Sequence, residues 1–117
     1  MGDSMDWEQY DGTIPIDMHL GFKLYLRRDC EYSRKRFDFK IAEKRDLDFL
    51  SKFDFSELIC FDLGANIGYW SVWLGAMAKA KEVHAFEPDP VTFSILEKNI
   101  LLNQISHNTL VHQLAIC

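Results

Sequence analysis

Hydrophobic and polar residues alternate in two stretches near the start of the chain. Residues 22–27 place an apolar side chain at every second position, and residues 36–41 repeat this two-residue period. Successive side chains of a β-strand point to opposite faces, so both stretches are predicted to be half-buried strands. The polar residues 28–35 between them would form the loop of an antiparallel pair. Apolar residues then recur at helical spacing, which predicts a short amphipathic helix within 43–53.

A different pattern begins near residue 58, where short apolar runs alternate with longer segments of helical period. It predicts strands at 58–63, 82–87 and 109–115, and helices at about 67–79 and 90–102. This alternation is typical of an α/β fold with parallel strands joined by right-handed crossovers. We expect the three strands to lie side by side in the order third, second, first.

The pattern divides the chain into three expected segments. Residues 1–13 are polar and acidic without any period, which predicts a disordered tail. Residues 14–57 would hold the small antiparallel β unit and the short helix. Residues 58–117 would hold the parallel sheet with its helices.

The most distinctive motif, FDLGANIGYW, occupies residues 61–70, directly after the first apolar run of the α/β part. It has the order of a strand, a turn containing Gly64 and Gly68, and the start of a helix. Such a turn is expected to expose backbone N–H groups, and a helix start favours a negatively charged ligand group. Glu87 closes the next predicted strand, where an acid can accept hydrogen bonds from ribose hydroxyls. Together these features predict half of a nucleoside-binding site.

Two motifs, DLGANIG at residues 62–68 and AFEPDP at residues 85–90, resemble those of the FkbM-type S-adenosylmethionine-dependent methyltransferases. The resemblance extends over roughly residues 20–117. It implies that the first motif wraps the methionine portion of S-adenosylmethionine and that the second supplies the ribose-binding acid. The residues that it assigns to the cofactor site are Asp62, Gly64, Ala65, Asn66, Gly68, Glu87 and Pro88.

The same resemblance implies a Rossmann-like methyltransferase fold of seven strands. In that fold the glycine turn follows the first strand, whereas this chain ends after the third. We therefore expect residues 58–117 to be the N-terminal half of a methyltransferase domain, truncated after the third parallel strand. The half that faces the substrate would be absent.

Individual roles follow from the resemblance for some of these residues. Asp62 would fix the glycine turn and approach the positive charge near the sulfonium or amino group of the cofactor. Asn66 has two open roles, because its amide could bind the cofactor carboxylate or cap the helix. Phe86 and Pro88 would flank the adenosine. No residue is assigned as a catalytic base.

The implied reaction is transfer of the sulfonium methyl to a hydroxyl of a sugar or natural product, so the expected partner is a small-molecule or glycan acceptor. An NAD-dependent oxidoreductase is a weaker alternative, because its fingerprint requires a glycine two positions after Gly64, where this chain has Asn66. A non-catalytic or partner-dependent fragment that binds the cofactor weakly is a second alternative. Self-association through the exposed edge of the sheet is also expected.

Composition narrows the expected partners further. The net charge is −5, and the one basic cluster, residues 34–36, is short and reads as solvated, which predicts no nucleic-acid partner. Three irregularly spaced cysteines fit a reducing compartment, so a cytoplasmic location is expected. The four histidines lack metal-ligand spacing, and no apolar run approaches the ~20 residues of a membrane span. Neither a metal site nor a membrane span is therefore predicted.

Overall fold

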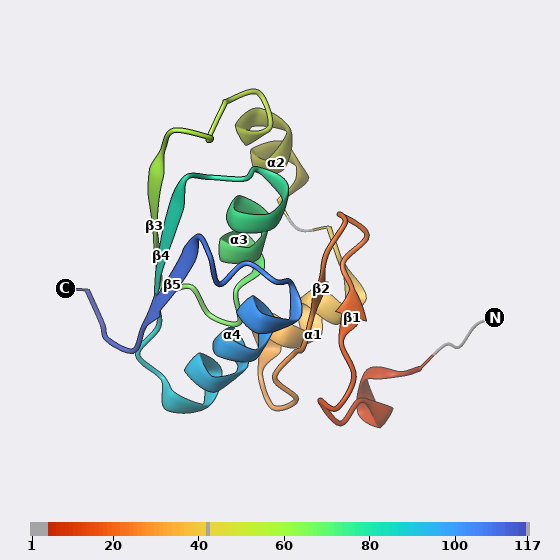
Figure 1. Cartoon of the computed structure of the whole chain (residues 1–117). Helices are drawn as coiled ribbons and strands as arrows, with labels where there is room; N and C mark the ends of the chain where they lie inside the picture. Colours follow the sequence, from red (N-terminus) through yellow and green to blue (C-terminus); the bar gives the residue numbers. More distant parts are fainter. Residues whose placement is uncertain (1–4, 42, 117) are drawn as a thin grey trace.

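A parallel three-stranded sheet forms one side of the protein in the computed structural model, which describes residues 5–41 and 43–116. Its strands are β3 (Ile59–Leu63), β4 (Glu82–Phe86) and β5 (Thr109–His112), in the order β3-β4-β5 (Figure 1). Both pairs are parallel. This confirms the α/β fold and the strand order third, second, first.

The helices of the α/β part lie on one side of this sheet (Figure 1). The first is α3 (Tyr69–Val72), which continues as a π-helical turn, η2 (Trp73–Met77). The second is α4 (Pro90–Leu102). The side chain of its N-cap, Asp89, accepts a hydrogen bond from the backbone N–H of Thr92, the third residue of the helix. A capping aspartate followed by proline is a common way to start a helix, and the predicted bounds of this helix are confirmed.

The N-terminal β unit differs from the prediction in its second strand. Its strands are β1 (Ile16–Asp17) and β2 (Lys23–Leu24), which pair antiparallel. Residues 36–41 are not a strand, because α1 (Glu31–Asp38) occupies the first half of this stretch and no strand follows in the second half. The buried residues of α1 are Ser33 and Phe37, four positions apart and thus on one helix face. A two-residue period over so few residues was too short to exclude a helix.

The short helix predicted within residues 43–53 is confirmed as α2 (Lys44–Leu50). Only Leu47 is buried on this helix. Phe49 and Phe53 are exposed and contact each other edge to face, with ring centroids 5.1 Å apart. Among the described residues, no helix is long and apolar enough to cross a membrane.

Residues 5–13 pack against the rest of the protein, whereas the sequence predicted a disordered tail over 1–13; residues 1–4 lie outside the described part. Trp7–Gln9 form a 3-10 turn, η1. Tyr10 is fully buried, and its hydroxyl donates to the Ile14 carbonyl at 2.8 Å and accepts from the Leu26 N–H at 3.0 Å. The two aromatic residues of this polar segment therefore anchor it, which its overall composition did not indicate.

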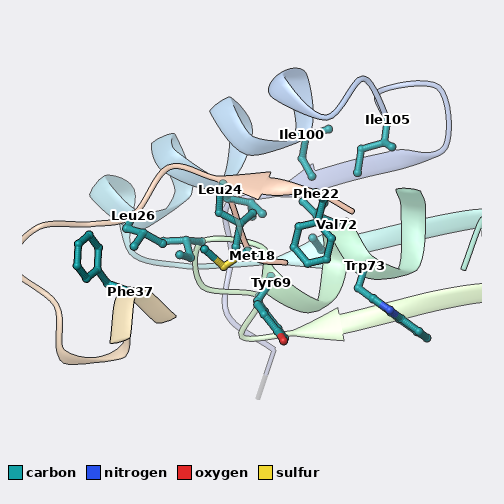
Figure 2. Close-up of a cluster of buried hydrophobic side chains, with 14 of the residues drawn as sticks. Met18, Phe22, Leu24, Leu26, Phe37, Tyr69, Val72, Trp73, Ile100 and Ile105 are labelled. Atoms are coloured by element: carbon teal, nitrogen blue, oxygen red, sulfur yellow. The ribbon is translucent and has the colours of Figure 1, made fainter. Parts of the chain in front are cut away.

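One hydrophobic core joins the N-terminal unit to the α/β part (Figure 2). Met18, Leu24 and Leu26 come from the N-terminal unit and belong to the same core as Tyr69 and Val72 of α3. The core therefore crosses the expected boundary at residues 57 and 58. The proposed segment bounds stay a prediction.

Two asparagine side chains, one in α4 and one at its C-cap, act as hydrogen-bonding partners for β2 and the residue after it. Asn99 is fully buried, and its Oδ1 accepts from the Tyr25 N–H at 2.6 Å. Its Nδ2 donates to the carbonyls of Tyr25 at 3.0 Å and of Ile67 at 2.7 Å. Nδ2 of Asn103 donates to the Lys23 carbonyl at 2.8 Å. These amides imitate a strand partner and fix the N-terminal unit against the glycine turn.

The face of the sheet opposite the helices is largely uncovered. On β3, Ile59, Phe61 and Leu63 are 57%, 66% and 57% exposed. The prediction of a buried strand here was therefore correct for only one of its two faces. On β4, Val83 and Ala85 face the helices and are fully buried.

Candidate functional site

The turn between β3 and α3 needs glycine at both expected positions. Gly64 and Gly68 have φ angles of 72° and 105°, in the left-handed region that favours glycine. A Cβ on Gly68 would also lie 2.9 Å from Cδ1 of Leu96 on α4. Asn66 has a φ of 56°, a conformation that asparagine tolerates better than most residues.

The backbone N–H groups of the turn are used within the protein. Gly64 and Ala65 both donate to the carbonyl of Phe86 at 2.9 Å, which ties the turn to the end of β4. Gly68 donates to the carbonyl of Ala65 at 3.0 Å. This differs from the expectation that the turn offers its N–H groups to a ligand.

Asn66 completes this arrangement with both its backbone and its side chain. Its N–H donates to Oε1 of Glu87 at 2.8 Å. Its side-chain Oδ1 accepts from the N–H of Ile67 at 2.9 Å, so it does not cap α3, whose N-cap is Gly68. Of its two predicted roles, helix capping is therefore not observed.

Glu87 is held on both of its carboxylate oxygens. Oε1 receives the Asn66 N–H, and Oε2 receives the Asp89 N–H at 3.1 Å. The residue is only 9% exposed. Each carboxylate oxygen has capacity for a further hydrogen bond, so a fixed acceptor pair stands at the end of β4. Pro88, next in the chain, is exposed at the same end.

A cavity of about 260 Å³ lies against the glycine turn. It brings together the turn and the N-terminal segment, which are distant in sequence. The lining residues are Tyr32, Arg36, Glu43, Asp62, Leu63, Gly64, Ala65, Asn66 and Trp70. Four of the seven predicted site residues are among them. Gly68 is buried at the start of α3, and neither Glu87 nor Pro88 lines this cavity.

Asp62 is the acidic group that β3 contributes to this cavity. Its Oδ2 accepts a hydrogen bond from Oγ of Ser71 on α3 at 2.6 Å. Burial raises the pKa of the Asp62 carboxyl above its usual value, the Ser71 hydrogen bonds oppose this rise, and the charge of Glu87 adds to it. A positively charged ligand group beside Asp62 would therefore relieve an unfavourable burial of charge.

Arg36, from α1, is the basic group of the same cavity. Its guanidinium carbon lies 5.1 Å from the ring centroid of Tyr32 and 5.4 Å from that of Tyr69. Within the described part of the chain, Nε of Arg36 is the one buried side-chain polar atom without a hydrogen-bond partner. Buried polar groups are nearly always paired, so this atom is an exception. The guanidinium as a whole places a positive charge at the wall of the cavity, which favours an anionic ligand group.

The sequence interpretation missed the N-terminal contribution to the site. Residues 34–36 were read as a solvated cluster, and the α1 segment was assigned in part to a strand. Burial raises the pKa of Tyr32 to about 12, so its hydroxyl stays neutral beside Arg36. A helical four-residue spacing between Tyr32 and Arg36 was the signal available in the sequence.

A second, more apolar cavity of about 470 Å³ adjoins the first along β3. The two share Glu43, Asp62 and Trp70. Nε1 of Trp70 donates to Oε2 of Glu43 at 2.9 Å, which fixes the side chain between the two cavities. The other lining residues of the second cavity are Asp46, Phe49, Leu50, Phe55, Cys60, Phe61 and Leu74.

Comparisons with known proteins place this site in a family. The family model of the TRM5/TYW2 methyltransferase domain matches residues 31–114. The tRNA wybutosine-synthesizing protein 2 homolog of Danio rerio is 30% identical over 98 residues, which cover 84% of this chain and 22% of that protein. The chain thus spans about a fifth of the length of this curated relative.

Solved structures agree with the fold. TYW2 of Pyrococcus horikoshii in complex with MeSAdo matches with a TM-score of 0.66 and 26% identity, over 82% of this chain and 34% of that one. TYW2 of M. jannaschii in complex with AdoMet matches with a TM-score of 0.63 over 82% of this chain and 40% of that one. At 24% identity, the second likeness shows the fold alone.

These findings correct three expectations from the sequence. The resemblance to FkbM-type enzymes was wrong, because the matching family model is a different one. The sugar or natural-product acceptor and the absence of a nucleic-acid partner are overturned as well, because the Danio rerio relative is named as a tRNA wybutosine-synthesizing protein. The acidic net charge was a poor guide, since it averages over a chain that spans only part of its relatives.

The family match covers α1, α2, the glycine turn and all three strands of the sheet, and therefore every residue of the first cavity. It also includes Glu87 and the Asp89 cap of α4. The cofactor motif was thus read in the right class of enzyme but in the wrong family. The chain belongs to the TRM5/TYW2 methyltransferase domain family.

Proposed function

We propose that the first cavity and Glu87 bind S-adenosylmethionine, and that the protein uses it to modify tRNA. The observation that carries the cofactor assignment is that Arg36 and Asp62, two side chains of opposite charge, line the same cavity. An amino-acid group carries a carboxylate and an ammonium, which these two side chains complement. The solved relatives that hold AdoMet or MeSAdo support the same assignment.

Each residue then has a distinct task. Arg36 would donate to the cofactor carboxylate, and its planar fork suits a bidentate contact. Asp62 would face the ammonium group, and Glu87 would accept from the ribose hydroxyls. The turn formed by Gly64, Ala65, Asn66 and Gly68 would support the ligand by shape, because its N–H groups are already bonded within the protein. Pro88 would border the adenosine.

Bound S-adenosylmethionine supplies a sulfonium whose attached carbon is open to attack by a nucleophile of the acceptor. The residues described above bind and orient the cofactor, and orientation of reactants is a major source of rate. The tRNA acceptor is supported by the family and by the name of the Danio rerio relative. The exposed apolar face of β3 favours a second candidate function, in which this chain binds the cofactor but needs a further polypeptide for transfer.

Binding of S-adenosylhomocysteine tests the cofactor site. We expect Arg36→Gln and Glu87→Gln each to weaken it roughly ten- to a hundredfold, because each removes a charged hydrogen bond. Glutamine at 87 is preferable to alanine, since its carbonyl oxygen can still accept one of the two backbone N–H groups. The matched control is Arg34→Gln, which lies on the same helix outside the cavity.

Calorimetric titration of the folded variants with S-adenosylhomocysteine measures these affinities. Equal affinities for wild type and Arg36→Gln would remove the carboxylate assignment. A comparable loss in Arg34→Gln would show that only net charge matters. Incubation of the chain with tRNA and cofactor labelled either in the methyl group or in the amino-acid carbons then shows whether, and with which group, transfer occurs. Cofactor binding without transfer would favour the second candidate function.

A further inference from the structure

Arg27 joins the segment after β2 to the start of α4. Its Nη1 donates to Oδ2 of Asp89 at 2.7 Å and to Oγ1 of Thr92 at 2.9 Å. Its Nε donates to Oδ1 of Asp29 at 2.7 Å. With carboxylates on two edges, the planar guanidinium has a fixed orientation. The backbone N–H of Arg27 donates to Oγ of Ser33 at 2.8 Å, which ties it to α1 as well.

Asp89 continues this connection towards the end of β4. Its Oδ2 also accepts the Thr92 N–H at 2.9 Å, which caps α4. Its own N–H donates to Oε2 of Glu87 at 3.1 Å. The Thr92 hydrogen bonds, with the Arg27 contact in addition, lower the pKa of the Asp89 carboxyl, so it stays ionised near neutral pH. A continuous path of hydrogen bonds therefore runs from Arg27 through Asp89 to Glu87.

The ion pair of Arg27 and Asp89 is partly exposed. The Arg27 side chain is 24% exposed and that of Asp89 is 47% exposed. The helix cap fixes Asp89 only relative to α4. Arg27 adds a connection to the N-terminal segment, which also supplies Arg36 to the cavity. This contact is therefore one of the links between the two sides of the site, beside the hydrogen bonds of Asn99.

We propose that Arg27 is a positioning residue that acts through Asp89 to hold the Glu87 carboxylate where it meets the ribose of the cofactor. This inference rests on the proposed function for the ribose contact. The position of Glu87 itself can be measured without any cofactor.

The first experiment compares Arg27→Ala with the matched charge-removal control Arg34→Ala by amide hydrogen exchange in the free protein. We expect the Asp89 and Asn66 amides, which donate to Glu87, to exchange about three- to tenfold faster in Arg27→Ala only. Arg27→Lys should restore part of the protection, because an ammonium can still reach Asp89. Unchanged exchange at both amides would overturn the inference.

The second experiment is a double-mutant cycle read by S-adenosylhomocysteine affinity. Arg27→Ala is expected to weaken binding about three- to tenfold in the wild-type background and to have little effect beside Glu87→Gln. A loss of the same size in both backgrounds would overturn the inference, because Arg27 would then act independently of Glu87. Wild-type protein that fails to bind would overturn the proposed function and the ribose contact, while faster exchange would still establish Arg27 as the support of Glu87.

Discussion

The site is built from a few side chains whose chemistry is set by burial. Burial disfavours the ionised form of Asp62 and raises its pKa, and Arg36 has a buried donor without a partner, so both carry an unfavourable energy in the free protein. Each cost would be relieved by a ligand of opposite charge. A site of this kind binds its ligand at the expense of stability in its absence.

Asp62→Asn should therefore stabilise the free protein near neutral pH. Burial raises the pKa of Asp62 in the folded state above the usual 3.8. When the pKa is higher in the folded state than in the unfolded state, protonation of the carboxyl stabilises the folded protein. This stabilisation is complete below the unfolded-state pKa and is lost as the pH rises through the folded-state pKa. At pH 7 we expect the Tm of Asp62→Asn to exceed that of wild type by roughly 2–5 °C.

Thermal unfolding followed by circular dichroism from about pH 3 to pH 8 checks this difference. It should shrink towards the acidic end, where the aspartate becomes neutral. Ser71→Ala is a useful companion, because it removes the hydrogen bond that opposes the pKa rise. A wild type that is more stable than Asp62→Asn at pH 7 would show that burial does not dominate at this carboxylate.

At the scale of elements, α4 connects the two parts of the chain. Its N-terminus is linked to Arg27, and its middle is linked through Asn99 to Tyr25 and to the glycine turn at Ile67. The side-chain amide of Asn99 replaces a strand partner that β2 lacks on this side. The position of the N-terminal unit, and hence of Arg36, depends on this helix.

Asn99→Leu should destabilise the protein by about 2–5 kcal/mol, because it leaves buried N–H and C=O groups without partners. The control is Asn103→Leu. It breaks the contact to Lys23 nearer the surface, where water can replace the lost bonds, and it should cost less than about 1 kcal/mol. Urea unfolding of both variants measures the two free energies. An equal loss of unfolding free energy in both variants would show that burial of Asn99 does not strengthen the contribution of its hydrogen bonds to stability.

At the scale of the whole molecule, the sheet is covered on one face and exposed on the other. Phe61 lies on the exposed face in the middle of the edge strand β3, and its ring contacts His84 and Phe86 at centroid distances of 5.4 and 6.0 Å. Large exposed apolar patches mark interaction surfaces or aggregation-prone regions.

Phe61→Lys should lower the binding of an apolar fluorescent dye and raise solubility, while the free energy of unfolding changes by less than about 1 kcal/mol. Phe39→Lys is the matched control, because Phe39 is 69% exposed but lies after α1, away from the sheet. We expect dye binding to fall much less for this variant. The same decrease in both would show that the sheet face is not the main apolar surface.

The sequence determined the α/β part of the fold and the glycine turn that borders the first cavity. The glycine turn and the position of Glu87 follow from local rules: buried strands need apolar residues, left-handed turns favour glycine, and parallel strands end at one edge. Asp89 and Pro90 likewise marked the start of α4 correctly. These features depend on neighbours in the chain, so the sequence alone was sufficient to predict them.

The tertiary structure decided what the N-terminal segment does. Alternation over residues 36–41 was compatible with a strand, but packing of Ser33 and Phe37 against the core selected a helix. That helix brings Arg36 to the glycine turn. The N–H groups of Gly64 and Ala65 in this turn are bonded to the carbonyl at the end of β4, which only the tertiary structure shows. Contacts between residues so far apart in sequence leave no local signature, because their energy depends on the packed arrangement and not on the order of neighbouring residues.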